Sequence, residues 1–198
     1  MTLQNIDSTH IVKVTDSINQ QQYTLMAAKV IKNSISLRNN YITINKGSAD
    51  GIVKDMAVIS PQTGVVGFVQ DVSENLATIR SLLNKNTAVS VFIKKNNAFG
   101  SLVWGDGNFD FRNALVKEIP NHFNVKVGDT VITSGVGSFP KGIEIGRIVK
   151  TGISTGDNFM TFEVSLFNDF STLQYVYIVK DRLATEQKAL EQQLPNEQ

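Results

Sequence analysis

The sequence predicts an all-β fold made of two small, related barrels, and two observations support this prediction. From Ala27 onward, short segments rich in Val, Ile, Phe, Tyr and Thr follow one another, separated by clusters of Gly, Asn, Asp or Pro. No long helical periodicity lies between them, which is typical of a β-sandwich or β-barrel. In addition, one pattern of turn, strand, turn and glycine-containing strand occurs twice along the chain.

The expected elements begin with a polar segment, residues 1–24, that contains at most one edge strand around Val12. Twelve strands are then expected near residues 27–32, 41–45, 56–60, 64–72, 76–82, 88–94, 98–104, 111–118, 130–134, 143–150, 159–166 and 172–179. Asn, Asp and Gly in segments 45–51 and 104–108 provide the positive φ angles that tight turns need.

A short helical tail is expected in residues 181–198, after the last strand. Asp181 can cap its first turn, good helix formers follow, and Pro195 ends it. Its leucines form only a thin apolar stripe, which favours a solvated tail over a helix that binds a partner.

The repeated pattern aligns residues 53–60, "VKDMAVIS", with residues 126–133, "KVGDTVIT". The segments "VVGFV" and "EIGRI" follow, with Gly67 and Gly146 at their centres. Glycine within a strand usually marks a bulge or a bend, so these two glycines are expected at equivalent bends of the two barrels. Chance similarity between β-rich segments is the alternative explanation.

The composition limits the classes of function. The 198 residues can form one large or two small domains, and 41% of them are apolar, as in an ordinary globular protein. With 19 basic and 18 acidic residues, the chain lacks the basic excess of a broad nucleic-acid surface. The absence of cysteine excludes disulfides, thiolate nucleophiles and cysteine-bound metals. Neither a membrane span nor a signal peptide is recognised, which leaves a cytosolic protein or part of a longer chain.

The segment 133–146, "TSGVGSFPKGIEIG", is the most glycine-rich candidate for chemistry. A dinucleotide fingerprint would need glycine where Pro140 stands, and a helix where a strand is expected. A nucleophile elbow would need glycine two residues before Ser134 or Ser138, and neither serine has it. The segment is therefore expected to be a turn that leads into a bent strand.

A serine hydrolase of the two-barrel type is the alternative with a catalytic site. His122, Asp129 and Ser134 occur in a suitable order, but they fall within 13 residues. Enzymes of this type draw the base and the nucleophile from different barrels, and His10 lies in the polar leading segment. No catalytic residue is therefore expected.

Metal and cofactor sites are not expected either. Two distant histidines and no cysteine leave only carboxylates as ligands, and no calcium-loop motif is present. The remaining acidic candidates are interpreted as ordinary exposed charges: Asp106, Asp110, Glu118 and Glu144.

Aromatic side chains are the remaining signal, because most of them lie in the second half of the chain. In a small barrel most aromatic residues belong to the core. Three of them lie in or beside expected turns, namely Phe109, Phe123 and Phe139. Exposed aromatic residues often anchor protein interfaces, so these three are the expected partner contacts, with burial in the core as the alternative.

Together, these turn and strand sequences resemble the extracytoplasmic part of the MreC family, the bacterial rod-shape-determining proteins. The resemblance covers about residues 27–180 and includes "NNYITINKGSADGI", "GVVGFVQDVS" and "VKVGDTVITSGVGSFPKGIEIGRI". Two segments are specific in combination: the Asn-Lys-Gly-Ser-Ala-Asp-Gly-Ile segment and the Gly-Asp-Thr-Val-Ile-Thr-Ser-Gly segment followed by Phe-Pro-Lys-Gly.

This resemblance implies two six-stranded barrels with a trypsin-like topology and no catalytic triad. It implies a non-enzymatic scaffold of the cell-elongation machinery, which binds and regulates a class B penicillin-binding transpeptidase. MreD, MreB and a RodA-type glycosyltransferase would belong to the same complex, and the full-length protein would form a homodimer or filament. The location would be periplasmic or extracytoplasmic, with an N-terminal membrane helix and a coiled coil preceding this sequence. An adaptor barrel of an envelope export system is a further alternative.

Two partitions of the barrels are compatible with the sequence. In the first, barrel one spans residues 25–95 and barrel two spans residues 96–180. In the second, barrel two is inserted into barrel one, and strands from about residue 155 to 180 return to barrel one. In both, turn and bulge positions are expected at Gly47, Gly51, Gly67, Gly128, Gly135, Gly142 and Gly146.

Overall fold

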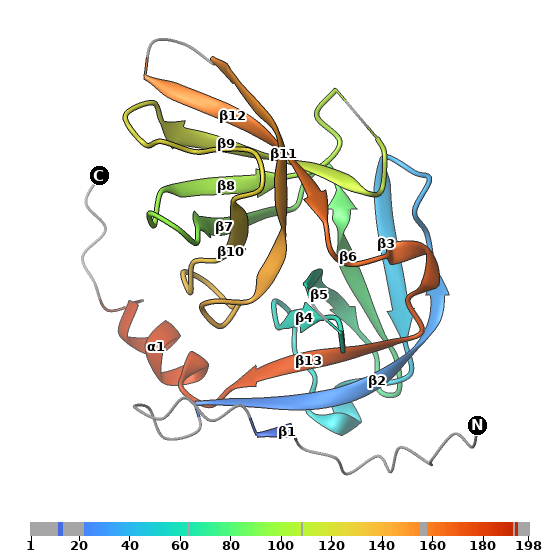
Figure 1. Ribbon diagram of the computed structural model, residues 1–198. Helices are drawn as coiled ribbons and strands as arrows, with labels where there is room; N and C mark the ends of the chain where they lie inside the picture. The colour runs from blue at the N-terminus through green and yellow to red at the C-terminus, as the bar shows by residue number, and fades with distance from the viewer. Residues whose placement is uncertain are drawn as a thin grey trace.

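The computed structural model describes residues 12–13, 22–62, 64–107, 109–154, 158–191 and 193 (Figure 1). Its strands are β1 (Val12–Lys13), β2 (Tyr23–Asn33), β3 (Asn39–Ile44), β4 (Ala57–Ile59), β5 (Val65–Val72), β6 (Ala77–Asn84), β7 (Ala88–Ile93), β8 (Phe99–Val103), β9 (Asn113–Pro120), β10 (Thr130–Thr133), β11 (Glu144–Ser154), β12 (Phe159–Leu166) and β13 (Tyr175–Asp181). The same part of the chain also contains the 3-10 turns η1 (Ser48–Asp50) and η2 (Phe170–Thr172) and the helix α1 (Ala184–Glu191).

The first barrel takes strands from both ends of the chain. Its six strands are hydrogen-bonded in the order β2, β13, β4, β5, β6 and β3, and β3 pairs with β2 to close the barrel. The short strand β1 lies beside β2, where the sequence predicts an edge strand. Because β13 follows all strands of the second barrel, the first barrel is complete only when both ends of the chain meet.

The second barrel is formed by one continuous part of the chain, from β7 to β12. It closes in the order β10, β11, β12, β9, β8 and β7, and it occupies the upper left of Figure 1. The predicted all-β fold with two six-stranded barrels is therefore confirmed.

The strand pairing has the inserted arrangement, but β12 stays in the second barrel and only β13 returns to the first, later than the expected residue 155. β7 pairs with β8 and β10, so the boundary between the barrels falls between β6 and β7, before the expected position at residue 95. β13 pairs with β2 and β4 of the first barrel. Local sequence marks where a strand begins and ends, whereas the edge that a strand closes depends on contacts between distant segments.

Alternation of side chains builds the core of each barrel. In β7, Val89, Val91 and Ile93 point inward and are at most 2% exposed, whereas Ser90 and Phe92 between them are half-buried. Each fully buried Val or Ile side chain stabilises the fold by about 1.5–3 kcal/mol relative to exposure. The apolar residues at every second position therefore determine which face of this strand lies inside.

The repeated sequence pattern forms the same structure twice. In the β4–β5 hairpin, the register shifts by one residue directly before Gly67, so that Val66 is skipped. In the β10–β11 hairpin, the register shifts in the same way directly before Gly146, and Ile145 is skipped. Such a bulge bends a strand and increases its twist, as closure of a small barrel requires.

The turns before these hairpins also correspond. Asp55 and Gly128 both have positive φ angles, of 67° and 95°. Their amides donate to the carbonyl oxygens of Val69 and Ile148, at 2.9 and 2.8 Å. Shared bulges, φ angles and hydrogen bonds favour an internal repeat over chance similarity.

Close approach of the backbone explains why the two bulge positions are glycine. A Cβ atom at Gly67 would overlap the carbonyl oxygen of Arg80, and one at Gly146 would overlap that of Ser165. The other expected glycines have two different roles: Gly47 approaches the carbonyl oxygens of Ser73 and Glu74, and positive φ angles occur at Gly51, Gly128, Gly135 and Gly142.

The Asn-Lys-Gly-Ser-Ala-Asp-Gly segment forms the turn around η1. The Asp50 carboxylate accepts hydrogen bonds from the Gly47 amide at 3.1 Å and from Lys46 Nζ at 2.7 Å. The hydrogen bond from Lys46 is the main cause of a lowered pKa of Asp50, and the bond from Gly47 adds to it. The ionised carboxylate thus stabilises this turn.

The helix α1 follows β13, as the sequence predicts. Asp181 Oδ1 accepts a hydrogen bond from the Leu183 amide at 2.9 Å, so its side chain stabilises the start of the tail. The expected stop at Pro195 lies outside the described residues. In the described part of the chain, no helix is both long and apolar enough to cross a membrane.

We predict that Gly146→Ala lowers the free energy of unfolding by roughly 2–3 kcal/mol, because the added methyl group overlaps the Ser165 carbonyl oxygen. Gly137→Ala is the matched control. Its Cβ would meet no atom within 4 Å, so only the positive φ angle should cost stability, by about 1 kcal/mol. Urea denaturation measures both values, and an equal or smaller loss at Gly146 would contradict the close-approach explanation.

We also predict that Asp50→Asn reduces the loss of stability in acid. A lowered pKa in the folded state means that Asp50 stabilises the protein above its unfolded pKa, near 3.9. This contribution is lost as the pH falls through the lower folded value. The variant should therefore be less stable than the parent at pH 7, and its thermal unfolding temperature should fall less between about pH 5 and pH 3. Parallel curves for the two proteins would argue against a role of the charged form.

Candidate interaction surface

Phe139 lies in the loop between β10 and β11, but its side chain is only 2% exposed. Its ring contacts that of Phe68 on β5 edge-on, with 4.9 Å between the ring centroids. Thr133 Oγ1 holds the loop by donating to the Pro140 carbonyl oxygen at 2.6 Å and accepting from the Ile143 amide at 2.9 Å. The prediction of an exposed Phe139 is therefore wrong, because the loop turns this side chain into the contact between the two barrels.

Phe109, in the loop between β8 and β9, is 45% exposed. Its ring lies 5.4 Å from that of buried Trp104, and the Arg38 guanidinium of the first barrel lies 5.5 Å from its centroid. Trp104 Nε1 donates to the Asp110 carbonyl oxygen at 2.9 Å. Phe109 thus combines an exposed edge with a second contact between the barrels.

Phe123 follows β9 and is half-buried against the core of the second barrel. The exposed His122 ring lies 4.4 Å from the Phe123 ring. The next carbonyl oxygen, that of Asn124, accepts a hydrogen bond from Asn96 Nδ2 in the β7–β8 turn at 3.4 Å. The Phe123 loop and the β7–β8 turn therefore share one end of the barrel.

The residues considered for a serine hydrolase make contacts with their neighbours in the same turns. Ser134 Oγ accepts from the Val136 amide at 3.1 Å, and Asp129 Oδ2 accepts from the Lys126 amide at 2.8 Å. The His122 ring contacts that of Phe123. Each of the three residues therefore contributes to the structure of its own turn. His10 lies outside the described residues.

Three of the four acidic candidates, Asp106, Asp110 and Glu144, pair with neighbouring cations, and the fourth, Glu118, is an exposed residue of β9. Lys117 contacts Asp106, and Lys94 contacts Glu144 at 2.8 Å. The hydrogen bond from Arg112 lowers the pKa of Asp110, and the bond from Lys94 lowers the pKa of Glu144. Both carboxyls remain ionised at neutral pH, which does not suit a general acid. Among the described residues, no group of three His, Cys, Asp or Glu side chains could hold a metal ion.

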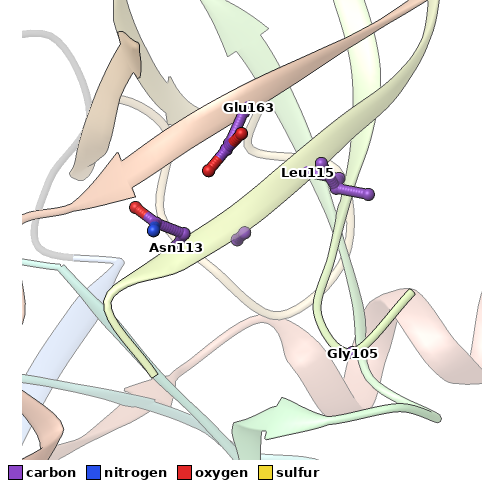
Figure 2. Close-up of a pocket in the computed structure, with 5 residues that line it drawn as sticks. Gly105, Asn113, Leu115 and Glu163 are labelled. Carbon is purple, nitrogen blue, oxygen red and sulfur yellow. The ribbon is translucent and has the colours of Figure 1, made fainter. Parts of the chain in front are cut away.

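A small hollow on the second barrel lies between β9, β12 and the loop at Gly105 (Figure 2). Figure 2 shows Asn113 and Glu163, from adjacent strands, at its edge. Its volume is about 50 Å³, whereas sites for drug-sized ligands are usually about 300–1,000 Å³. A hollow of this size holds a few water molecules and is too small for a drug-sized ligand.

An aromatic pair outside the three predicted contact residues lies on the outer side of the second barrel. Phe92 on β7 and Phe99 on β8 are directly paired, with ring centroids 5.7 Å apart. Lys141 Nζ lies 5.5 Å from the centroid of the Phe92 ring. The signal for this pair was present in the sequence, because both residues occupy outward positions of strands that flank a short polar turn.

Comparison with protein families identifies the relatives of this fold. The family model described as "Rod shape-determining protein MreC, barrel core" matches residues 30–180. The chain belongs to the MreC family. The MreC resemblance noted in the sequence is thus confirmed, and the matched region extends from β2 into β13.

Two MreC relatives align with most of this chain but with a smaller share of their own length. The cell shape-determining protein MreC of Listeria monocytogenes is 33% identical over 181 residues, which cover 89% of this chain and 60% of the relative. MreC of Escherichia coli is 23% identical over 161 residues, covering 81% and 43%. The chain thus spans about half the length of these relatives.

Solved MreC structures share the fold. The structure of Listeria monocytogenes MreC has a TM-score of 0.73 and 32% identity, covering 86% of this chain and 80% of that one. A structure titled the major periplasmic domain of the cell shape-determining filament MreC has a TM-score of 0.69 and 25% identity, with coverages of 82% and 99%. Helicobacter pylori MreC, solved in complex with penicillin-binding protein PBP2, has a TM-score of 0.64 and 16% identity, with coverages of 81% and 99%.

We predict that Phe139→Ala lowers the free energy of unfolding by about 3–5 kcal/mol, as expected for removal of a buried Phe side chain. Phe99→Ala, at a side chain that is 46% exposed, is the matched control and should cost about 1 kcal/mol or less. Denaturant titration of both variants measures the difference. If Phe139→Ala were as mild as Phe99→Ala, the contact with Phe68 would not hold the two barrels together.

Proposed function

We propose that this chain is the extracytoplasmic part of a cell-shape-determining scaffold and that it binds a class B penicillin-binding transpeptidase. The observation that carries the proposal is the Helicobacter pylori complex, in which an MreC protein of the same fold is bound to PBP2. Membership of the MreC family supports the link to cell shape.

The proposed role is non-enzymatic. The hollow at Glu163 is much smaller than a site for a drug-sized ligand, and Asp106, Asp110 and Glu144 are paired with cations. The two barrels contact each other through Phe68 and Phe139 and again through Arg38 and Phe109. These contacts hold the two barrels in one arrangement. Such a protein suits the role of a scaffold, because its binding surface is already ordered before a partner binds.

The wider assembly is also part of the proposal. In it, MreD, MreB and a RodA-type glycosyltransferase join the same complex, and the whole protein forms a homodimer or filament. A periplasmic location, with an N-terminal membrane helix as the anchor, agrees with the relative described as the periplasmic domain of a filament. The scaffold would in this way connect peptidoglycan synthesis to the elongation machinery.

Phe109 and Phe123 are the proposed partner contacts of the three phenylalanines that the sequence singles out. Phe109 retains an exposed edge, and Phe123 lies at one end of the second barrel with part of its ring accessible. Aromatic residues of this kind often contribute strongly to binding because they remove a large apolar area from water.

We predict that the chain binds the soluble ectodomain of the class B penicillin-binding protein from its own organism. Isothermal titration calorimetry measures the Kd. Phe109→Ala and Phe123→Ala should each raise the Kd about tenfold, equivalent to about 1.4 kcal/mol. Tyr41→Ala, at a side chain of the first barrel that is 43% exposed, is the control and should leave the Kd unchanged.

Thermal unfolding of each variant separates lost binding from lost folding. A well-folded parent chain that does not bind the ectodomain would refute the proposed partner. Binding that neither phenylalanine variant weakens would leave the partner in place and remove these two contacts.

A further inference from the structure

A row of outward-facing side chains crosses four strands of the second barrel. Strand pairing places Glu144 of β11 opposite Ile132 of β10, Ile132 opposite Phe92 of β7, and Phe92 opposite Phe99 of β8. The inward positions beside them, such as Val131, are fully buried. The three apolar members of the row therefore form one strip on the outer side of the sheet, of which only Phe92 and Phe99 are accessible.

The strip ends in an accessible aromatic pair. Phe99 is 46% exposed and meets the half-buried Phe92 edge-on, at an interplanar angle of 70°. Ile132, next in the row, is only 7% exposed. An exposed aromatic ring supported by a second ring is a suitable anchor for a protein partner, because its apolar area is large and its conformation is already ordered.

Basic side chains surround this strip. Lys141 lies over the Phe92 ring, and Lys94 follows β7 on its outer side. Arg147 is paired with Thr130, whose carbonyl oxygen accepts a hydrogen bond from the Lys94 amide at 2.9 Å.

The acidic end of the row is Glu144. Lys94 and Arg147 both act on this carboxyl: the hydrogen bond from Lys94 is the main cause of its lowered pKa, and the charge of Arg147 adds to the effect. Two cations thus act on this carboxylate, and Lys141 over the Phe92 ring is a third, which leaves an excess of positive charge beside the aromatic pair.

We propose that this surface, formed by Phe92, Phe99, Lys94, Lys95, Lys141 and Arg147 and called here the β7–β8 face, docks an acidic segment with apolar side chains on the class B penicillin-binding protein. The inference rests on the proposed function and names the part of the chain that would carry it. Charge complementarity selects the acidic partner, and the Phe92–Phe99 pair selects its apolar side chains.

The β7–β8 face is continuous with the Phe123 loop. Asn96, in the turn between β7 and β8, donates a hydrogen bond to the carbonyl oxygen of Asn124. A partner segment that covers Phe99 would therefore meet Phe123 at the same end of the barrel, and Lys95 in the same turn would contribute a further exposed cation.

The test uses the whole 198-residue chain and the soluble ectodomain of the organism's class B penicillin-binding protein. Surface plasmon resonance measures the Kd at about 50 and about 300 mM salt. Phe99→Glu should raise the Kd at least about tenfold. Lys141→Glu and Lys95→Glu should each raise it about three- to tenfold at low salt and reduce its salt dependence.

Tyr175→Glu is the matched control. Tyr175 is an aromatic residue on the outside of the first barrel, with 44% exposure against 46% for Phe99, and this variant should change the Kd less than about twofold. If Phe99→Glu lowers the thermal unfolding temperature, the decision rests on Lys95→Glu, whose side chain lies in an exposed turn.

The outcomes separate the proposed docking face from the proposed function. Binding by the parent chain that survives all three β7–β8 variants would overturn the docking face and leave the proposed function intact. Failure of the parent chain to bind would refute the proposed function and the face with it. Sedimentation of the parent chain as a dimer that Phe99→Glu dissociates would assign the face to a second copy of this chain, and would also overturn the proposal.

Discussion

The pairing of β2 with β13 is the constraint on which the rest of the structure depends. Seven residue pairs, from Tyr23 opposite Asp181 to Lys29 opposite Tyr175, join the first long strand to the last. Without β13, the first barrel would leave β2 and β4 with unpaired edges, because β13 lies between them. The second barrel is therefore inserted as a closed unit, and the first barrel depends on contacts between distant parts of the chain, which are intrinsically slow to form.

One structural repeat serves two purposes in this molecule. Phe68 and Arg147 occupy equivalent positions, each directly after the bulge glycine of its hairpin. In the first barrel this outward position is apolar and packs on Phe139, so it becomes part of the contact between the barrels. In the second barrel it is an exposed arginine beside Glu144. The backbone is thus duplicated, while the outward side chains differ between a structural contact and a charged surface.

The candidate surface could be predicted only in part from the sequence. Phe109 is exposed as expected, because its loop lies outside the barrel. Phe139 occupies a similar turn context but is buried, because the other barrel supplies Phe68 as its neighbour. The contact between Phe92 and Phe99 could not be predicted from the sequence, because the register of the hairpin decides which residues of its two strands are neighbours. Exposure in a loop depends on what packs against the loop, and the local sequence does not contain this information.

The sequence by itself determined the all-β class, the twelve main strands, the glycine bends and the repeat, because side-chain alternation and backbone sterics act over a few residues. It also carried the segments that identify the MreC family. Only the tertiary structure decided that β7 belongs to the second barrel and β13 to the first. It also decided that Phe139 joins the barrels while Phe99 faces solvent. The physical reason is that strand partners and burial are set by contacts between segments far apart in the chain, which a local pattern leaves open.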